Sequence, residues 1–283
     1  MAINSIELRE VYIPAAIRKY AKESVTSVLD SDGLFHEEAG KYYVKKVSTT
    51  GLGDYDKNSA DGYPSSAVTI DYQEIVPETE RATSIDIDRR DEAKSGGAFN
   101  EAMADLMEQH VGPETDATRI AKIFSSDLIT KVEEDITTGE AAIASLRKCM
   151  THVENNAVNA KLLLFVNPNF KGMVDDMDTT KSRKVMENFE VHKVMSSRFW
   201  TAIEKHTGRD GANGYSKAEG ASPINYICVP AGSVGTKLDI IAKVLSPDQQ
   251  RKDCWSYPIR IENIIEVFEA RANGIYASYA PAE

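Results

Sequence analysis

Residues 41–72 of this chain read KYYVKKVSTTGLGDYDKNSADGYPSSAVTIDY, and they constrain its architecture more than any other part. The stretch begins with Lys41 to Val47, where aromatic and β-branched residues predict a strand. Ser48 to Ser66, which follow, are nearly all polar or turn-forming. An irregular loop of this length is uncommon in a compact domain, where about 12–15 residues is already long. We therefore expect the loop to act outside the domain that carries it.

Two alternating segments come after the loop. Val68 to Tyr72 and Ser84 to Asp88 alternate between apolar and polar residues, which predicts strands with one polar face. A proline-containing turn at Val76 to Glu80 separates them. Together with Lys41 to Val47, these segments predict a projection of two or three strands that is polar on one face. Such a projection is marginally stable alone, so it needs a partner surface.

Helices are predicted on both sides of the projection. Pro14 to Leu29 has apolar residues near helical spacing and ends at turn-forming residues. A polar link separates it from the rest, so we interpret it as an arm. A second helix begins at Gly96 and continues to Phe124 with one apolar face. Gly112 and Pro113 interrupt its pattern, and proline is tolerated in a first helical turn. This long element is therefore either one kinked rod or two collinear helices.

The C-terminal half mixes helices and strands without βαβ alternation, which indicates the α+β class. A helix is predicted at Glu140 to Val153, mostly helical or irregular structure at Asp175 to Thr201, and a flexible glycine-rich loop at Gly208 to Ser222. Predicted strands are Leu162 to Val166, Ile224 to Val229, Leu238 to Val244, Ile259 to Phe268 and Gly274 to Ala277.

The net charge of the chain argues against nucleic-acid binding as its main function. The 283 residues carry a formal charge of -11, and the longest basic run is the short stretch Lys181 to Lys184. Proteins that bind phosphates without sequence preference usually show a basic excess on one face. Weak local contacts with DNA stay possible at Arg18, Lys19 and Lys22, which lie close together on the polar face of the arm.

Cysteine usage and hydropathy indicate a protein that folds in a cytoplasm. Cys149, Cys228 and Cys254 are widely spaced, so they are interpreted as small buried apolar residues and not as a disulfide framework. The first ten residues lack the pattern of a signal peptide. No stretch approaches the ~20 apolar residues that span a bilayer.

No catalytic, cofactor-binding or metal-binding residue is predicted. Asp86, Asp88 and Asp91 could share one side of a strand as metal ligands, but a solvated strand face explains them better. The five histidines are scattered, and His110 is interpreted as a packing residue of the long helix. Ala231 to Gly235 does not have the spacing of a nucleophile elbow.

Five strings in sequence order resemble the tailed-bacteriophage major capsid proteins of the HK97 fold. They are VKKVSTTGLGDYD at 44–56, IDIDRRDE at 85–92, VGPETDATR at 111–119, LFVNP at 164–168 and NGIYAS at 273–278. The resemblance covers about residues 41–279. The chain departs from the family at Ala93 to Ser95, where a glutamate and threonine pair is usual. That departure lies just before the start of the long helix.

The resemblance implies an HK97-like division of the α+β chain. Residues 1–40 would form the N-terminal arm, 41–92 the extended β-hairpin called the E-loop with its strands, and 93–137 the peripheral domain with the long spine helix. Residues 138–255 would form mainly the axial domain, and 256–283 the C-terminal strands that return to the peripheral domain. The E-loop tip would contact a neighbouring subunit through Gly51, Leu52, Asp54, Tyr55, Lys57 and Tyr63.

The implied function is a head shell that self-assembles from hexamers and pentamers around double-stranded DNA. The implied partners are other copies of the chain, a separate scaffolding protein, a portal and a decoration protein, with DNA held by confinement and with no membrane. The implied location is the virion, after assembly in the bacterial host cytoplasm. One alternative is an encapsulin-like compartment shell of the same fold. A second is a soluble metal-dependent enzyme that uses the carboxylates of Asp86, Asp88 and Asp91.

Overall fold

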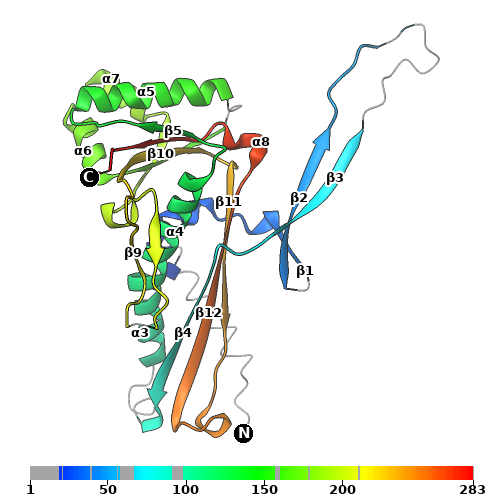
Figure 1. Cartoon of the computed structure of the whole chain (residues 1–283), viewed down its shortest axis with the longest axis vertical. Helices are drawn as coiled ribbons and strands as arrows, with labels where there is room; N and C mark the ends of the chain where they lie inside the picture. Colours follow the sequence, from blue (N-terminus) through cyan, green and yellow to red (C-terminus); the bar gives the residue numbers. More distant parts are fainter. Residues whose placement is uncertain are drawn as a thin grey trace.

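The computed structural model describes residues 19–20, 22–38, 40–55, 57, 67–90, 98–156, 160–177, 179–209 and 211–282. Figure 1 shows a tall body with a narrow projection leaving one side. A five-stranded sheet with helices lies at one end of the body, and a long three-stranded sheet packed on a helix forms the other end. The projection belongs to a separate three-stranded sheet.

The five-stranded sheet has the order β5-β13-β10-β6-β7. Its central strands β10 (Ile224–Pro230) and β6 (Leu162–Val166) are antiparallel and almost wholly buried. Because both faces of these strands are covered, they are continuous apolar runs and do not alternate. Helices α5 (Gly139–Asn156), α6 (Pro168–Asp176) and α7 (Thr180–Met186) share one apolar cluster with this sheet.

Three edge or neighbouring strands complete this sheet. They are β13 (Tyr276–Tyr279), β5 (Thr130–Glu133) and β7 (Phe189–Lys193). The prediction of mostly helical or irregular structure at Asp175 to Thr201 did not include β7, which pairs in parallel with β6. Strand β5, which pairs in parallel with β13, was not predicted either. Both strands are too short for a periodicity to stand out.

The long sheet has the order β11-β12-β4 and is antiparallel throughout. Its members are β11 (Val234–Ala242), β12 (Cys254–Val267) and β4 (Thr79–Asp88). The prediction that Ser84 to Asp88 could form a third strand of the projection is therefore wrong. Ile85 and Ile87 of this segment pack against the apolar cluster that contains Tyr257 and Met107, which places β4 in the body.

The predicted spine is one continuous helical run with a wide turn in the middle. It consists of α3 (Ala98–Asp105), the π-helix η3 (Leu106–Val111) and α4 (Gly112–Ser125). The Gly112 N–H donates to the Met107 carbonyl, and Pro113, which has no N–H, occupies the first turn of α4. A Cβ at Gly112 would lie 3.3 Å from that carbonyl oxygen, which is a tight contact.

The end of the predicted leading helix is built into the body. Its first part lies outside the described residues, and its last part is the 3₁₀ helix η1 (Val25–Leu29). Leu29 is buried in the main core beside Ile120 of α4, and Tyr20 is buried beside Met107. The 3₁₀ turn η2 (Asp32–Leu34) and strand β1 (Phe35–Glu38) continue from it toward the projection.

The glycine-rich segment Gly208 to Ser222, which was predicted to be a flexible loop, contains the second strand of a β-hairpin. Strands β8 (Ile203–Lys205) and β9 (Tyr215–Lys217) pair antiparallel. Gly208, Gly211 and Gly214 have φ values of 76°, 77° and 78°, which only glycine adopts without strain. These glycines therefore adopt the backbone conformation of the connection between β8 and β9, and the prediction of a loop is wrong at β9.

Candidate subunit interface

The projection is a two-stranded ribbon that leaves the body. Strand β2 (Lys41–Thr49) pairs antiparallel with β3 (Val68–Ile75), and β1 pairs with only the first part of β2. The strands that the sequence predicted at Lys41 to Val47 and Val68 to Tyr72 are confirmed. Figure 1 shows that the outer part of the ribbon has no contact with the body.

The root of the ribbon is anchored in the body by an apolar cluster. Tyr42, Val44 and Ile75 are buried together with Phe35 and Ile264. Because these residues belong to β1, β2, β3 and β12, the cluster fixes the angle at which the ribbon leaves the long sheet.

A polar cluster adds to this anchor. The Tyr42 hydroxyl lies 2.9 Å from Asp239 Oδ2 and 3.1 Å from Glu262 Oε2, while Arg260 pairs with Glu262 at 2.7 Å. Lys237 Nζ lies 5.0 Å from the centre of the Tyr42 ring. Burial and the two neighbouring carboxylates raise the pKa of Tyr42, so its hydroxyl keeps its proton as a donor.

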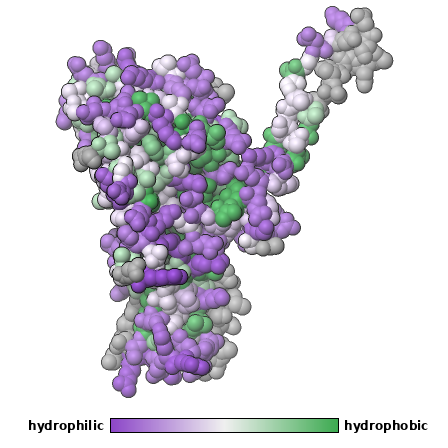
Figure 2. Space-filling model, viewed as in Figure 1, coloured by the Kyte–Doolittle hydropathy of each residue, from purple (hydrophilic) through white to green (hydrophobic). Residues whose placement is uncertain are grey.

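The two faces of the ribbon differ in chemistry. Directly paired residues of antiparallel strands point to the same face. One face carries the pairs Val47–Ile70, Lys45–Tyr72 and Thr49–Val68, and the other carries Lys46–Asp71 and Ser48–Thr69 beyond the root. Figure 2 shows green patches along the shaft of the projection.

The apolar face is uncovered. Val47, Val68, Ile70 and Tyr72 are between 53% and 61% exposed. Single exposed apolar residues are ordinary, but four that share one face of a narrow ribbon indicate an interaction surface. The prediction of a projection that is polar on one face is confirmed, and its opposite face is the candidate interface.

The predicted tip residues lie at the far end of the ribbon. Gly51, Leu52, Asp54, Tyr55 and Lys57 are exposed, and Leu52 is 107% exposed. Tyr63 lies outside the described residues. The contact of these side chains with a neighbouring subunit stays a prediction.

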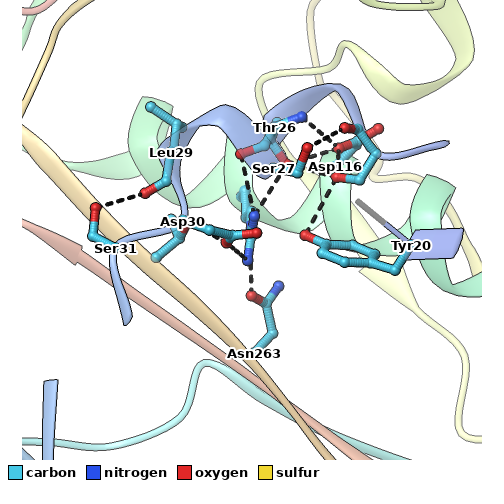
Figure 3. A network of polar contacts seen from close by, with 11 residues as sticks. Tyr20, Thr26, Ser27, Leu29, Asp30, Ser31, Asp116 and Asn263 are labelled. Carbon is cyan, nitrogen blue, oxygen red and sulfur yellow. Dashed lines mark hydrogen bonds and ion pairs between the residues drawn. The ribbon is translucent and has the colours of Figure 1, made fainter. Parts of the chain in front are cut away.

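A buried polar network ties the N-terminal segment to the spine. Asp116 of α4 is 0% exposed and accepts from the Ser24 hydroxyl at 2.7 Å, the Thr26 hydroxyl at 2.7 Å and the Thr26 N–H at 3.0 Å. Its other oxygen accepts from Val25 N at 3.2 Å and from Arg198 at 3.1 Å. Figure 3 shows Asp116 and Tyr20 on one side of this network, with Asp30 and Asn263 on the other.

The guanidinium of Arg119 completes the network. Arg119, one helical turn beyond Asp116, is also 0% exposed. It pairs with Asp30 at 2.7 Å and donates to Asn263 Oδ1 at 3.2 Å and to the Thr26 carbonyl at 3.2 Å. The roles of Asp116 and Arg119 were missed from the sequence, although both lie in the string at 111–119 that carries part of the resemblance.

Asp86 and Asp88, which were considered as metal ligands, accept hydrogen bonds from groups of their own chain. Hydrogen bonds from Ser256, Lys252 and Ser84 lower the pKa of Asp86 to about 2, and Asp88 accepts from the Arg90 N–H at 2.8 Å. Asp91 lies outside the described residues. Within the described ranges, no group of three or more potential ligands could hold a metal ion.

The burial of His110 was predicted wrongly, and that of Cys149 and Cys228 correctly. His110 is exposed at the π-turn, so its interpretation as a packing residue is wrong. Cys149 and Cys228 are buried, as predicted, whereas Cys254 is only partly buried. Contact with Cys228, together with burial, raises the pKa of Cys149. Among the described helices, none is both long and apolar enough to cross a membrane.

Comparison with known proteins defines the fold. The head structure of Helicobacter pylori bacteriophage KHP40 matches with a TM-score of 0.60, 9% identity and 91% of each chain covered. A virus-like particle from Pyrococcus furiosus matches with a TM-score of 0.58 and 13% identity, over 96% of this chain and 99% of that one. A structure from Gordonia phage Cozz matches with a TM-score of 0.57 and 12% identity, over 92% and 87%.

The chain therefore has the α+β, HK97-like fold that these shell structures share. No protein-family model matches the sequence, and no curated protein matches it significantly. At identities of 9% to 13%, the likeness to these structures lies in the fold.

Proposed function

We propose that this chain is the major capsid protein of a tailed bacteriophage, which self-assembles into the hexamers and pentamers of an icosahedral head around double-stranded DNA. The observation that carries the proposal is the uncovered apolar face of the ribbon formed by β2 and β3. A two-stranded ribbon is marginal in water, and this one carries apolar side chains where its own body cannot cover them.

The fold supports the same conclusion. It is shared with a phage head structure and with a virus-like particle, and each comparison covers more than nine-tenths of this chain. Identical subunits with a one-sided projection form heterologous contacts, which close into rings when the rotation allows it. The partners in this proposal are other copies of the chain, a separate scaffolding protein, a portal and a decoration protein. The location is the virion, after assembly in the host cytoplasm.

The encapsulin-like compartment is a second candidate, because the Pyrococcus furiosus structure is a virus-like particle and not a phage head by its description. Particles purified from the natural source separate the two functions. Packaged double-stranded DNA supports the capsid, and an enclosed enzyme supports the compartment. The metal-dependent enzyme has no comparable support, because Asp86 is already bound by Lys252 at 2.9 Å and Ser84 at 3.0 Å.

The test is a charge placed on the apolar face. Ile70→Asp should leave the free subunit within about 0.5 kcal/mol of wild type, because Ile70 is exposed. It should reduce the yield of closed shells at least tenfold, because a loss of about 1.4 kcal/mol at one contact weakens it tenfold and the contact repeats around the shell. Thr69→Asp, on the polar face of the same strand, is the matched control and should assemble. Negative-stain microscopy and sedimentation measure the yield, and normal assembly of Ile70→Asp contradicts the proposal.

Free subunits should bind duplex DNA weakly and in a salt-sensitive way. The charge of -11 opposes a neutralising role, and Lys19, one of three candidate contacts, already pairs with Glu108 at 2.6 Å. Arg18 lies outside the described residues, and Lys22 is exposed. Filter binding or anisotropy should show binding that disappears at about 0.15 M salt, where the Debye length is about 8 Å. Binding that persists at high salt contradicts the proposal that the shell confines DNA without binding it tightly.

A further inference from the structure

One face of the long sheet carries a row of three carboxylates. Asp239 of β11 pairs directly with Glu262 of β12, and Glu262 pairs directly with Glu80 of β4. Residues that lie opposite each other in antiparallel strands point to the same face, and like charges in that position repel each other. Glu262 is 6% exposed, so its carboxylate is largely removed from water. A buried carboxylate of this kind requires hydrogen-bond donors or cations beside it.

The hydroxyl of Tyr42 is a donor that reaches two members of this row. It lies 2.9 Å from Asp239 Oδ2 and 3.1 Å from Glu262 Oε2. Glu262 has a second partner, because Arg260 Nη2 lies 2.7 Å from its Oε1. Lys237 Nζ lies 5.0 Å from the centre of the Tyr42 ring. Charged groups of the long sheet therefore surround one phenol, and that phenol belongs to strand β2 of the ribbon.

These hydrogen bonds add a directional constraint to the apolar cluster at the root. The burial of Val44 and Ile75 against Ile264 holds the root on the long sheet, but apolar burial is non-directional. A hydrogen bond weakens steeply when its angle departs from the ideal. The bonds of the Tyr42 hydroxyl therefore restrict the angle between the ribbon and the long sheet more than the apolar cluster does alone.

An ion pair further along the ribbon constrains it less. Lys46 lies 3.7 Å from Glu269 of α8, but the two side chains are 40% and 72% exposed. Exposed ion pairs contribute little, because water and salt screen them and because ordering two long side chains costs entropy. The angle at the root therefore depends mainly on the Tyr42 hydroxyl and the apolar cluster.

A small rotation at the root produces a large displacement at the end of the ribbon. From Tyr42 to Thr49, at about 3.3 Å per residue, the strand spans about 23 Å. A rotation of about 10° at the root moves that end by about 4 Å, whereas apolar side chains are in contact only within about 4.0–4.5 Å. Identical subunits repeat the contact, and the rotation between neighbours determines whether they close into rings. The direction of the ribbon therefore determines which assembly closes.

We propose that Tyr42 is a positioning residue of shell assembly, whose hydroxyl sets the direction of the β2–β3 ribbon through Asp239 and Glu262. The direction of the ribbon then selects the closed shell that the subunits form. Tyr42 is 3% exposed, so it acts through the ribbon and not by touching a neighbouring subunit. This inference rests on the proposed shell function and adds to it a residue that controls the geometry of the shell.

The direction of the ribbon can be measured in free subunits. Tyr42→Phe keeps the ring in the apolar cluster and removes the hydroxyl. Spin labels at Thr49→Cys and Lys243→Cys, two exposed positions, report the distance between the ribbon and the long sheet by double electron–electron resonance in a Cys254→Ser background. The distance distribution should be about 4 Å wider in Tyr42→Phe, which corresponds to a rotation of about 10° at the root. Ile75→Val removes a methyl group from the same apolar cluster, so it is the matched control and should leave the width unchanged.

Assembly supplies the second measurement. Where the wild-type protein forms shells of one diameter, folded Tyr42→Phe subunits should form shells of mixed diameter or open sheets, and Ile75→Val should form wild-type shells, as seen by negative-stain microscopy. Asp239→Asn keeps an acceptor oxygen for the hydroxyl and should assemble as wild type. Asp239→Leu removes that acceptor and should resemble Tyr42→Phe. Because Asp239→Leu also relieves the repulsion from Glu262, it should stay folded and provides the test if Tyr42→Phe does not fold.

The failure of this inference differs from the failure of the proposed function. Either a wild-type distribution of shell diameters or an unchanged label distance, in folded Tyr42→Phe or Asp239→Leu subunits, overturns only the role of Tyr42. Absence of shells from the wild-type protein contradicts the proposed function itself.

Discussion

Subunits that lack Gly53 to Tyr63 should fold and fail to close shells. In the sequence, the deleted residues lie between the paired parts of β2 and β3, and no core cluster contains any of them among the described residues. Removal of an exposed loop tip is tolerated by a domain that keeps its core. The lost side chains include Tyr55, which is exposed at the tip, so we expect the effect in assembly and not in folding.

Circular dichroism and thermal unfolding should be close to wild type for this deletion, and negative-stain microscopy should show rings or monomers in place of shells. A second variant, in which the same residues are replaced by a glycine–serine linker of equal length, separates length from chemistry. We expect it to fail as well, because it lacks side chains that can pack on a neighbour. Closed shells from the deletion at wild-type yield contradict the assignment of the ribbon as the subunit contact.

Asp116→Ala should be the most destabilising single substitution in the described part of the spine. The change removes the acceptor of Ser24, Thr26 and Val25, and it leaves Arg198 beside a buried site without its carboxylate. Loss of one partner of a buried ion pair costs about 3–5 kcal/mol. The segment that contains Thr26 should also become easier to cleave, because four of its hydrogen bonds to α4 end on this carboxylate. The contacts of Arg119 with Thr26 and Asp30 remain in this variant.

Denaturant unfolding of free subunits measures the loss, and limited proteolysis measures the release of the N-terminal segment. Asp105→Ala is a suitable control, since Asp105 is exposed on α3 of the same helical run. Arg198→Met should cost less than Asp116→Ala, because Asp116 keeps its donors from Ser24, Val25 and Thr26. If Asp116→Ala unfolds like Asp105→Ala, the network does not hold the segment to the spine.

The ribbon, the spine and the central strand could be predicted because their signals are local: apolar–polar alternation, an apolar helix face, a proline in a first turn and a short apolar run. The ribbon was predictable because Val68 to Tyr72 alternates on a strand that is polar on one face, and such a pattern survives without tertiary information. The spine was predictable from its apolar face and from Pro113 at a first turn. The central strand at Leu162 to Val166 was equally clear as a short apolar run.

The remaining features depend on partners that are distant in sequence. Ser84 to Asp88 has the same alternation as the ribbon strands, and only its pairing with Cys254 to Pro258 places it in the body. Asp116 and Arg119 look like ordinary exposed helix residues until Ser24, Asp30 and Asn263 surround them. Periodicity indicates which face of an element is apolar, but it does not indicate what covers a polar face.

The uncovered apolar face of the ribbon should make an isolated copy of this protein prone to aggregation at high concentration. Among the described strands, β3 pairs with β2 alone, so it presents one open edge together with the side chains of Val68, Ile70 and Tyr72. Those are the properties that template non-native aggregation. Assembly with another subunit should therefore compete kinetically with non-specific aggregation. The rate of synthesis relative to the rate of assembly should then determine the fraction of subunits that form ordered particles.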